Sequence, residues 1–231
     1  MPYRALACDY DATLATRGRV PGSVLEALEE WRRSGRLLLL VTGRTLDDLR
    51  SVFPSFSLFS RVVLENGGVV FHPETGHVDL LARTPPEQFV RRLRDRGVQP
   101  LTVGQVLVAS KLPHDRTMGE AIRELGLELH LVLNRESVMA LPSGVTKATG
   151  LEAALQQVRV PWEQVVGVGD AENDAAFLER CGRSIAVANA IPGLRESVDQ
   201  VTRAPEGAGV VEVVRGLLSG AVAGFPKEMT S

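Results

Sequence analysis

The chain has 231 residues, of which 44% are hydrophobic, and its 26 Lys and Arg against 28 Asp and Glu give a formal net charge of −2. This length and apolar content are enough for a large core, and the balanced charge argues against nucleic acid or an anionic membrane surface as a partner. No run approaches the roughly 20 apolar residues that span a bilayer, and the N-terminus lacks the regions of a signal peptide, so we expect a cytoplasmic protein.

The first predicted strand ends in a pair of carboxylates. The apolar residues 5–7 lead into Asp9 and Asp11. On extended backbone, residues two apart point to the same side, so this pair concentrates negative charge that a hard cation such as Mg²⁺ would relieve. An Asx-rich turn at the end of a strand explains the same residues equally well. The rest of the chain has to decide between the two interpretations.

Predicted strands and helices alternate through the first 83 residues. The run 37–41 is Leu-Leu-Leu-Leu-Val, without polar alternation, which is typical of a strand covered on both faces in a parallel sheet. Thr45 is a predicted cap for the helix that follows. The predicted elements are helices at 21–34 and 45–53 and strands at 61–65, 69–71 and 78–81, with a turn at 72–76.

The pattern changes at Thr84 and returns after Pro142. Between them we expect helices at 85–96 and 115–125 and strands at 98–102, 105–110, 128–133 and 137–141, which together indicate a small α+β insert of 59 residues. Beyond it we expect a helix from Thr146, a strand at 165–168, a helix at 172–180, a strand at 184–187, a helical turn at 191–198, an edge strand at 200–202 and a helix at 210–218.

These elements predict an α/β protein with a doubly wound parallel sheet. Its core is expected to comprise residues 1–83 and 143–219, with the insert at 84–142 as a cap and a mobile tail at 220–231. Cys8 and Cys181 lie in apolar surroundings without CxxC or Cys/His spacing, so we expect free buried thiols. No sequence signal sets an oligomeric state.

Polar residues follow several of the predicted core strands. In an open parallel sheet the ligand crevice lies beyond the carboxyl ends of the strands, so these residues are expected to converge there. Each has an ordinary explanation as a cap or loop residue, but their joint occurrence favours a site. They are Asp9 and Asp11, Thr42, Glu65 and Asn66, and the loop Gly169-Asp170-Ala171-Glu172-Asn173-Asp174, with Lys147 at the start of the helix after the insert.

Together these residues resemble the haloacid dehalogenase superfamily. The matching motifs are DxDxT at Asp9 to Thr13, the Thr at position 42, the isolated Lys147, and GDxxND at Gly169 to Asp174. The insert between Thr42 and Lys147, preceded by the segment 65–68 (Glu-Asn-Gly-Gly), is similar to the Cof-type and sucrose-phosphatase-like branch. The caps of that branch close over sugar phosphates or other small phosphomonoesters.

The resemblance implies a Mg²⁺-dependent phosphatase that works through an aspartyl-phosphate. Asp9 would be the nucleophile and Asp11 the general acid and base. Contacts to Mg²⁺ would come from Asp9, the backbone carbonyl of Asp11, and Asp170, with Asp174 close by. Thr42, Gly43 and Lys147 would hold phosphoryl oxygens, and Asn173 would support them. Arg44 is a further candidate for contact with the substrate.

The physical logic agrees with these roles. A carboxylate is a weak nucleophile toward a dianionic phosphate, so Mg²⁺ and Lys147 have to neutralise charge while Thr42 fixes the geometry. Asp11 has to protonate the leaving alkoxide and then activate water. The substrate is expected to be a small phosphorylated metabolite, such as a sugar phosphate or a phosphoglycolate-like compound.

Two features depart from the family or extend it. Ala12 stands where the family usually has Gly. An alanine there is strained by roughly 1 kcal/mol if its φ is positive. The insert is short for a Cof-type cap, which favours a smaller or more open pocket. In the cap, Lys111 and His114 lie in a loop that we consider as a contact for an anionic substrate group, with solvent exposure as the alternative.

Two other functions remain open from the sequence. Phosphomutases of the same superfamily return the phosphoryl group from the aspartyl-phosphate to sugar. A non-enzymatic phosphoacceptor of the response-regulator kind also combines clustered Asp, a Thr and a Lys on a doubly wound sheet. Such a receiver is about half this length and has no insert before its Lys, which argues against it.

Overall fold

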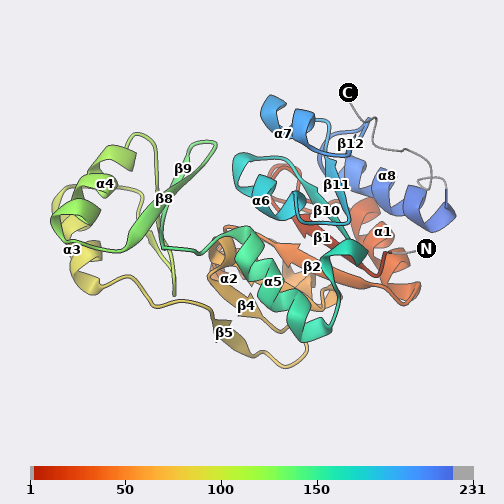
Figure 1. Cartoon of the computed structure of the whole chain (residues 1–231), viewed down its shortest axis with the longest axis horizontal. Helices are drawn as coiled ribbons and strands as arrows, with labels where there is room; N and C mark the ends of the chain where they lie inside the picture. Colours follow the sequence, from red (N-terminus) through yellow and green to blue (C-terminus); the bar gives the residue numbers. More distant parts are fainter. Residues whose placement is uncertain (1–2, 221–231) are drawn as a thin grey trace.

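The computed structural model describes residues 3–220 and contains two sheets (Figure 1). The larger has eight strands in the order β12-β11-β10-β1-β2-β3-β4-β5. Neighbours from β12 to β3 are parallel, and β4 and β5 join in antiparallel pairs. Its strands are β1 (Ala5–Asp9), β2 (Leu37–Val41), β3 (Arg61–Leu64), β4 (Val69–Phe71), β5 (Val78–Leu80), β10 (Val165–Gly169), β11 (Arg183–Ala186) and β12 (Gln200–Val201). The predicted α/β class with a parallel sheet is confirmed.

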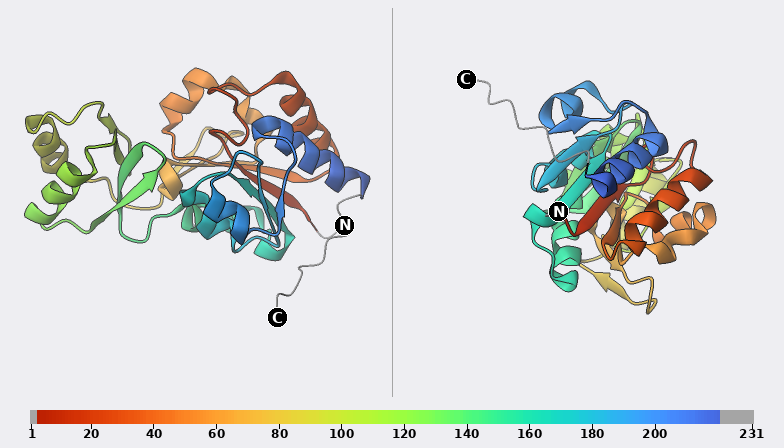
Figure 2. Two further views of the ribbon diagram at one scale, coloured as in Figure 1. Left: turned by 90° about the horizontal axis from the view of Figure 1, so that it is seen from above. Right: turned by 90° about the vertical axis from the view of Figure 1, so that its right-hand side faces the viewer.

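Helices cover both faces of this sheet (Figure 2). One face carries α1 (Gly22–Arg33), α2 (Leu46–Val52) and α8 (Glu206–Ser219). The other carries α5 (Lys147–Val158), α6 (Ala175–Leu178) and α7 (Pro192–Ser197). Short 3-10 helices complete the core at η1 (Pro54–Leu58), η2 (Glu65–Gly67), η3 (Trp162–Gln164) and η4 (Glu172–Asp174).

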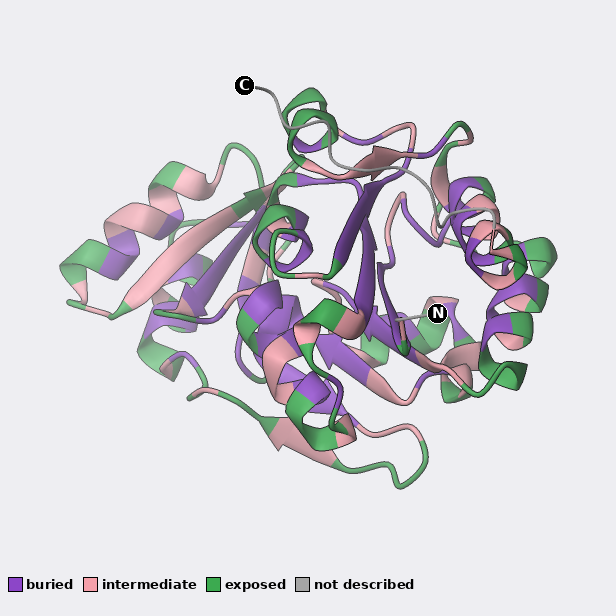
Figure 3. Ribbon diagram, turned by 45° about the vertical axis from the view of Figure 1, so that its right-hand side comes forward, coloured by how far each residue is buried: buried purple, intermediate pink, exposed green. Residues whose placement is uncertain are grey.

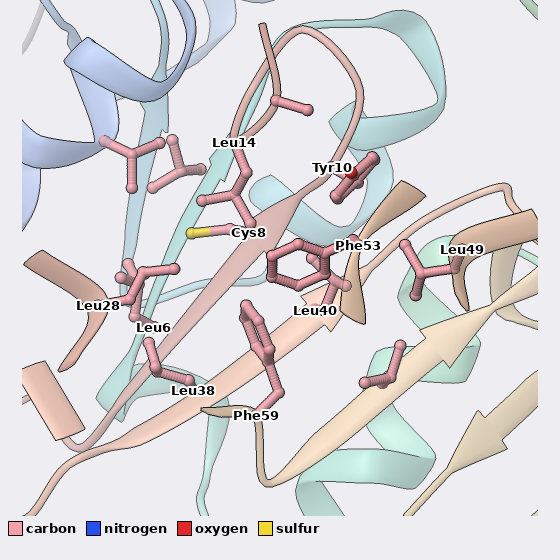
Figure 4. Close-up of a cluster of buried hydrophobic side chains, with 14 of the residues drawn as sticks. Leu6, Cys8, Tyr10, Leu14, Leu28, Leu38, Leu40, Leu49, Phe53 and Phe59 are labelled. Atoms are coloured by element: carbon pink, nitrogen blue, oxygen red, sulfur yellow. The ribbon is translucent and has the colours of Figure 1, made fainter. Parts of the chain in front are cut away.

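The alternation of strand side chains explains the two apolar layers. In β1, Leu6 and Cys8 pack toward α1 and α8, whereas Ala5 and Ala7 pack toward α5. The first layer is seen in Figure 4, where Leu38, Leu40 and Phe59 lie beside the β1 side chains. Figure 3 shows the middle strands of the sheet buried along almost their whole length, as the unbroken apolar run at 37–41 predicts.

The smaller sheet belongs to residues 84–142, which we call the cap. Its strands, β6 (Thr102–Val103), β7 (Val108–Lys111), β8 (Leu129–Asn134) and β9 (Ser137–Pro142), pair antiparallel in the order β6-β7-β9-β8. Helices α3 (Glu87–Asp95) and α4 (Asp115–Glu124) pack on one face, against Val108, Val138 and Ala140. The other face, with Met139 and Leu141, packs against the core.

Several predicted boundaries are wrong for identifiable reasons. The strand expected at 98–102 is reduced to β6, because Pro100 has no N–H to pair with a neighbour. The strand expected from position 105 begins only at Val108, because the backbone N–H groups of residues 105–107 donate to Glu65 instead. The helix expected at 172–180 is split into η4 and α6, and α8 starts at Glu206, before the expected 210.

Three further expectations concern the tail, membrane-spanning helices and the two cysteines. The tail predicted at 220–231 lies outside the described residues, apart from Gly220. Within residues 3–220, no helix has both the length and the apolar character needed to cross a membrane. Cys8 and Cys181 are both free thiols, as expected; Cys8 is buried, whereas Cys181 is only partly buried, and burial raises the pKa of each.

Candidate active site

The carboxyl ends of four neighbouring strands bring the predicted polar residues together. Asp9 is the last residue of β1, Thr42 follows β2, Glu65 follows β3, and Asp170 follows β10. These strands are adjacent and parallel, so their ends meet at one edge of the sheet. All four of these side chains are buried.

Lys147 bonds two buried carboxylates at this edge of the sheet. Its Nζ donates to Oδ1 of Asp9 at 2.5 Å and to Oδ1 of Asp174 at 2.7 Å. Oxygens of Asp9, Asp170 and Asp174 all lie within 4.8 Å of one another, and all three residues are buried. The structure thus brings Lys147 and the three carboxylates together from positions far apart in the chain, as the sequence predicts.

Negative charge dominates the cluster. Burial is the main cause that raises the pKa of Asp9; the Lys147 ammonium opposes the shift, and the charges of Asp174 and Asp170 add to it. Burial alone would lower the pKa of Lys147, but Asp174 and Asp9 outweigh that effect and raise it. Three buried carboxylates around one ammonium therefore suit a hard divalent cation with oxygen ligands such as Mg²⁺.

Asp170 is bonded from both the core and the cap. Its Oδ1 accepts from the Thr13 hydroxyl at 3.0 Å, and its Oδ2 accepts from the guanidinium of Arg135, in the turn between β8 and β9. Burial, followed by the charge of Asp174, raises the pKa of Asp170, and both hydrogen bonds oppose that rise. The cap thus contributes a cation directly to the carboxylate cluster.

The position of Lys147 depends on close packing between the segment 65–68 and the start of α5. Gly67 has φ +107°, and a Cβ there would lie 1.9 Å from the carbonyl oxygen of Thr146. Only glycine is free of a side chain at this contact. The Thr146 hydroxyl caps the helix by accepting from the N–H of Thr149 at 3.2 Å, which fixes the first turn that carries Lys147.

Asp174 holds the loop after β10 as well as Lys147. Its Oδ2 accepts from the backbone N–H groups of Asp170 at 2.9 Å and Ala171 at 3.0 Å. A Cβ at Gly169 would lie 2.7 Å from that carboxylate, so the loop closes around it only with glycine at this position. Asn173 donates to Oδ1 of Asn66 at 2.9 Å, which ties this loop to the segment after β3.

Asp11 does not share the surroundings of Asp9. The strand ends at Asp9, and the two carboxylates have different partners: Asp9 bonds Lys147, whereas Asp11 bonds Arg44. Asp11 is about half exposed and is bonded by Arg44, with Nε–Oδ2 at 2.8 Å and Nη2–Oδ1 at 2.7 Å. Arg44 also bonds Asp48 and lies over the ring of Tyr10, whose pKa is raised to about 12 by burial.

Ala12, between the metal-suited cluster and the following turn, has φ +57°. This is the strained alternative of the two that the sequence allowed, at roughly 1 kcal/mol. Asn189 holds the loop in place: its Nδ2 donates to the carbonyl of Ala12 at 2.8 Å, and its Oδ1 accepts from the N–H of Glu206 at 2.7 Å.

The cap covers the loop after β2. Thr42 is fully buried, and its Oγ1 accepts from the N–H of Arg44 at 3.2 Å. A Cβ at Gly43 would lie 3.4 Å from Sδ of Met139 in β9. The core-facing side of the cap sheet therefore lies directly above the residues expected to hold a phosphoryl group.

The two cap residues singled out from the sequence have different surroundings. The imidazole Nε2 of His114 lies 2.9 Å from the carbonyl oxygen of Gln99, within the cap. Lys111 is exposed at the end of β7, where it pairs in register with Ser137. That end of the sheet also carries the turn with Arg135.

Sequence reasoning missed three residues that build this site. In the sequence, Thr13 is only the end of DxDxT, and Glu65 is a polar residue after a strand and the start of the segment 65–68; neither shows the hydrogen bonds it makes. Arg135 was not noted at all. The available signal was the short polar segment Asn134-Arg135-Glu136 between two predicted strands, but nothing in one sequence says which turn of a cap faces the core.

Comparison with known proteins identifies the family of the chain. The model of the haloacid dehalogenase-like hydrolases matches residues 6–99 and 102–214. The chain belongs to this family. The resemblance drawn from the motifs, Cof-type branch included, is thereby confirmed, and the chain is a phosphatase, which sets aside the non-enzymatic phosphoacceptor.

Individual relatives of this haloacid dehalogenase-like phosphatase extend over nearly all of the chain. A phosphoglycolate phosphatase of Methanothermobacter thermautotrophicus is 32% identical over 92% of this chain and 97% of its own. A phosphoglycolate phosphatase of Aeropyrum pernix is 28% identical over 94% of this chain and 95% of its own. A haloacid dehalogenase-like hydrolase from Bacteroides thetaiotaomicron has the same fold, with a TM-score of 0.78, 17% identity, and coverage of 93% of this chain and 99% of its own.

Proposed function

We propose that this phosphatase is Mg²⁺-dependent and hydrolyses small phosphomonoesters through an aspartyl-phosphate on Asp9. The observation that carries the proposal is the contact between Asp9 and the Lys147 ammonium, inside a cluster of three buried carboxylates. The relatives named above act on phosphoglycolate, so it is the first substrate to test. The size of the cap agrees with a small substrate.

Asp9, Asp170 and the backbone carbonyl of Asp11 would hold Mg²⁺, with Asp174 close by. The ion would supply positive charge for the phosphoryl oxygens. Lys147 would supply charge from the other side, and its two carboxylate partners keep its Nζ in place. Thr42, Gly43 and Asn173 would orient the phosphoryl group from the loops after β2 and β10.

The reaction is written in two steps. An Asp9 carboxylate oxygen attacks phosphorus while the bond from phosphorus to the ester oxygen breaks, and Asp11 gives its proton to the leaving alkoxide. Asp11, now a carboxylate, then takes a proton from water as that water attacks phosphorus and the bond from phosphorus to the Asp9 oxygen breaks. Inorganic phosphate leaves and Asp9 is restored. Asp11 is half exposed, outside the Lys147 cluster, and bonded by Arg44, so the two carboxylates of the pair stand in different surroundings.

The test uses purified protein, Mg²⁺ and an aryl phosphate. We expect release of inorganic phosphate without a bisphosphate activator, loss of activity with EDTA, and recovery when Mg²⁺ is added back. Asp9→Asn is expected to lower kcat by at least roughly 1000-fold, because it removes the nucleophile. Asp47→Asn is the matched control, since the Asp47 side chain is 96% exposed.

Two outcomes would contradict the proposal. Activity that survives Asp9→Asn would show that another group is the nucleophile. A requirement for a bisphosphate activator, with transfer of the phosphoryl group to sugar, would identify the phosphomutase alternative instead.

A further inference from the structure

The cap places one guanidinium against the edge of the carboxylate cluster. Arg135 lies in the turn of the β8–β9 hairpin with φ +53°, and it donates to Oδ2 of Asp170. Figure 1 shows this hairpin extending from the cap toward α6 of the core, and β8 contacts η4 there. The Asp170 side chain is 2% exposed, whereas that of Arg135 is 49% exposed. The Asp170 end of this ion pair is buried in the core, and the Arg135 end is open to solvent.

The same end of the cap sheet carries a second cation. Ala109 and Met139 pair across β7 and β9 on the side that packs against the core. Because strand side chains alternate, Lys111 lies on that same side, two residues beyond Ala109. Its register partner Ser137 is two residues from Arg135. The two cationic residues are therefore neighbours at the edge of the cap that meets the site.

We propose that Arg135 binds a carboxylate on the substrate, remote from the phosphoryl group, and that Lys111 adds positive charge beside it. This subsite rests on the proposed function, because it assigns the non-phosphate end of that reaction's substrate. The planar fork of a guanidinium matches a carboxylate with two parallel hydrogen bonds. Mg²⁺ held by Asp170 would repel the Arg135 guanidinium. The guanidinium would then pair with the carboxylate of the incoming substrate.

The charges of the site support this division. Lys147 and the proposed Mg²⁺ position are both in the core, next to Asp9, where the phosphoryl group has to bind. Arg135 approaches the same cluster from the cap, and its partner Asp170 has an oxygen within 4.8 Å of one on Asp9. Arg135 is thus separated from the nucleophile Asp9 by one carboxylate, that of Asp170, which favours a short carbon chain between the two anionic ends of the substrate.

The experiment compares 2-phosphoglycolate with ethyl phosphate, which has the same chain length and no carboxylate, in the Mg²⁺-loaded enzyme. Arg135→Gln is expected to lower the ratio of the two kcat/KM values by roughly 10- to 100-fold, mainly through KM for 2-phosphoglycolate, the range of a charge-assisted hydrogen bond. Arg135→Lys keeps the charge without the planar fork, so its ratio of kcat/KM values is expected to lie between those of the wild type and Arg135→Gln. Lys111→Gln is expected to lower the ratio less.

Arg116→Gln is the matched control. Arg116 is a cap arginine on α4, paired with Glu120 and remote from the core-facing side of the sheet, so we expect an unchanged ratio. A bisphosphate of similar length, ethylene glycol bisphosphate, forms another arm. If Arg135→Gln affects it as strongly as 2-phosphoglycolate and the wild type prefers it, the group bound is a phosphate and the assignment to a carboxylate is overturned.

Binding gives a readout apart from turnover. In an Asp9→Asn background, calorimetry is expected to show weaker 2-phosphoglycolate binding with Arg135→Gln than without it, and no such difference for ethyl phosphate. If Arg135 only holds the cap against Asp170, the variant alters both ligands equally, and that result overturns the subsite. Hydrolysis of neither ester by the wild type would overturn the proposed function instead, and the binding measurement still tests Arg135. Arg135→Lys replaces Arg135→Gln if the latter does not fold.

Discussion

The core and cap sides of the site are built in opposite ways. On the core side, the side chains of Asp9, Lys147 and Asp174 are at most 6% exposed and are bonded to one another. On the cap side, Arg135 is about half exposed and has one carboxylate partner. A buried charge with several partners cannot turn away without a large cost, whereas a half-exposed one can exchange partners. The core is therefore suited to fixed chemistry, and the cap to the choice of substrate.

Replacing Lys147 by Met tests the core half of the comparison and carries the largest expected effect. The variant leaves Asp9 and Asp174 buried without their counter-charge, so we expect the free energy of unfolding without metal to fall by about 3 kcal/mol or more. Turnover of every phosphomonoester is expected to be lost together. Urea unfolding and assays with charged and uncharged esters measure the two effects.

Mg²⁺ sharpens the same test. If the ion binds the carboxylate cluster, it stabilises the Lys147→Met variant more than the wild type, because it replaces part of the missing positive charge. An unfolding midpoint equal to that of the wild type without metal would show that Lys147 is not needed to balance the buried carboxylates.

Replacing Asp11 by Asn separates the two carboxylates of the DxD pair. Asp11 is half exposed and outside the Lys147 cluster, so we expect stability to change by less than about 1 kcal/mol while kcat falls roughly 100- to 10,000-fold from lost proton transfer. Inorganic phosphate is expected to bind with nearly wild-type affinity. A kcat within a few-fold of the wild type would remove Asp11 from the general acid and base role, and Asp47→Asn serves again as control.

Replacing Glu65 by Gln tests how the two halves are joined. The Glu65 carboxylate belongs to the core, yet it accepts from the cap backbone N–H groups of Gln105 at 2.9 Å, Val106 at 2.7 Å and Leu107 at 3.0 Å. An amide loses one acceptor and presents an N–H₂ group to these donors, so we expect the protein to be destabilised by about 1–3 kcal/mol. Faster amide hydrogen exchange at 105–107, with little change in β1, is the specific readout. Equal exchange in both regions would contradict a local attachment.

The core side was predictable because its residues follow strands. Asp9, Thr42 and Asp170 each stand at the end of an apolar run, and the parallel sheet brings such ends together wherever the intervening chain goes. The cap side was not predictable in this way. Whether Arg135 or Lys111 meets the core depends on which face of an antiparallel sheet is covered by α3 and α4, and hydrophobic patterning in β8 is too weak to decide that.

The sequence also did not predict which side chains accept hydrogen bonds from backbone N–H groups. Glu65 takes up the N–H groups that a strand at 105–107 needs, and the sequence shows no trace of a partner 40 residues away. Asp11 likewise has a partner that the sequence does not reveal, the guanidinium of Arg44, which lies 33 residues further along the chain.

Replacing Ala12 by Gly carries the smallest expected effect. Ala12 has φ +57°, and relief of that strain, roughly 1 kcal/mol, is offset in part by the greater freedom of glycine in the unfolded chain. We therefore expect the free energy of unfolding to rise by less than about 1 kcal/mol, measured in urea. Asn189 holds the Ala12 carbonyl whichever residue stands there, so the loop geometry and the ratio of kcat/KM for 2-phosphoglycolate to that for ethyl phosphate are expected to stay as they are. A large change in turnover would show instead that the strained backbone at Ala12 positions Asp11 for catalysis.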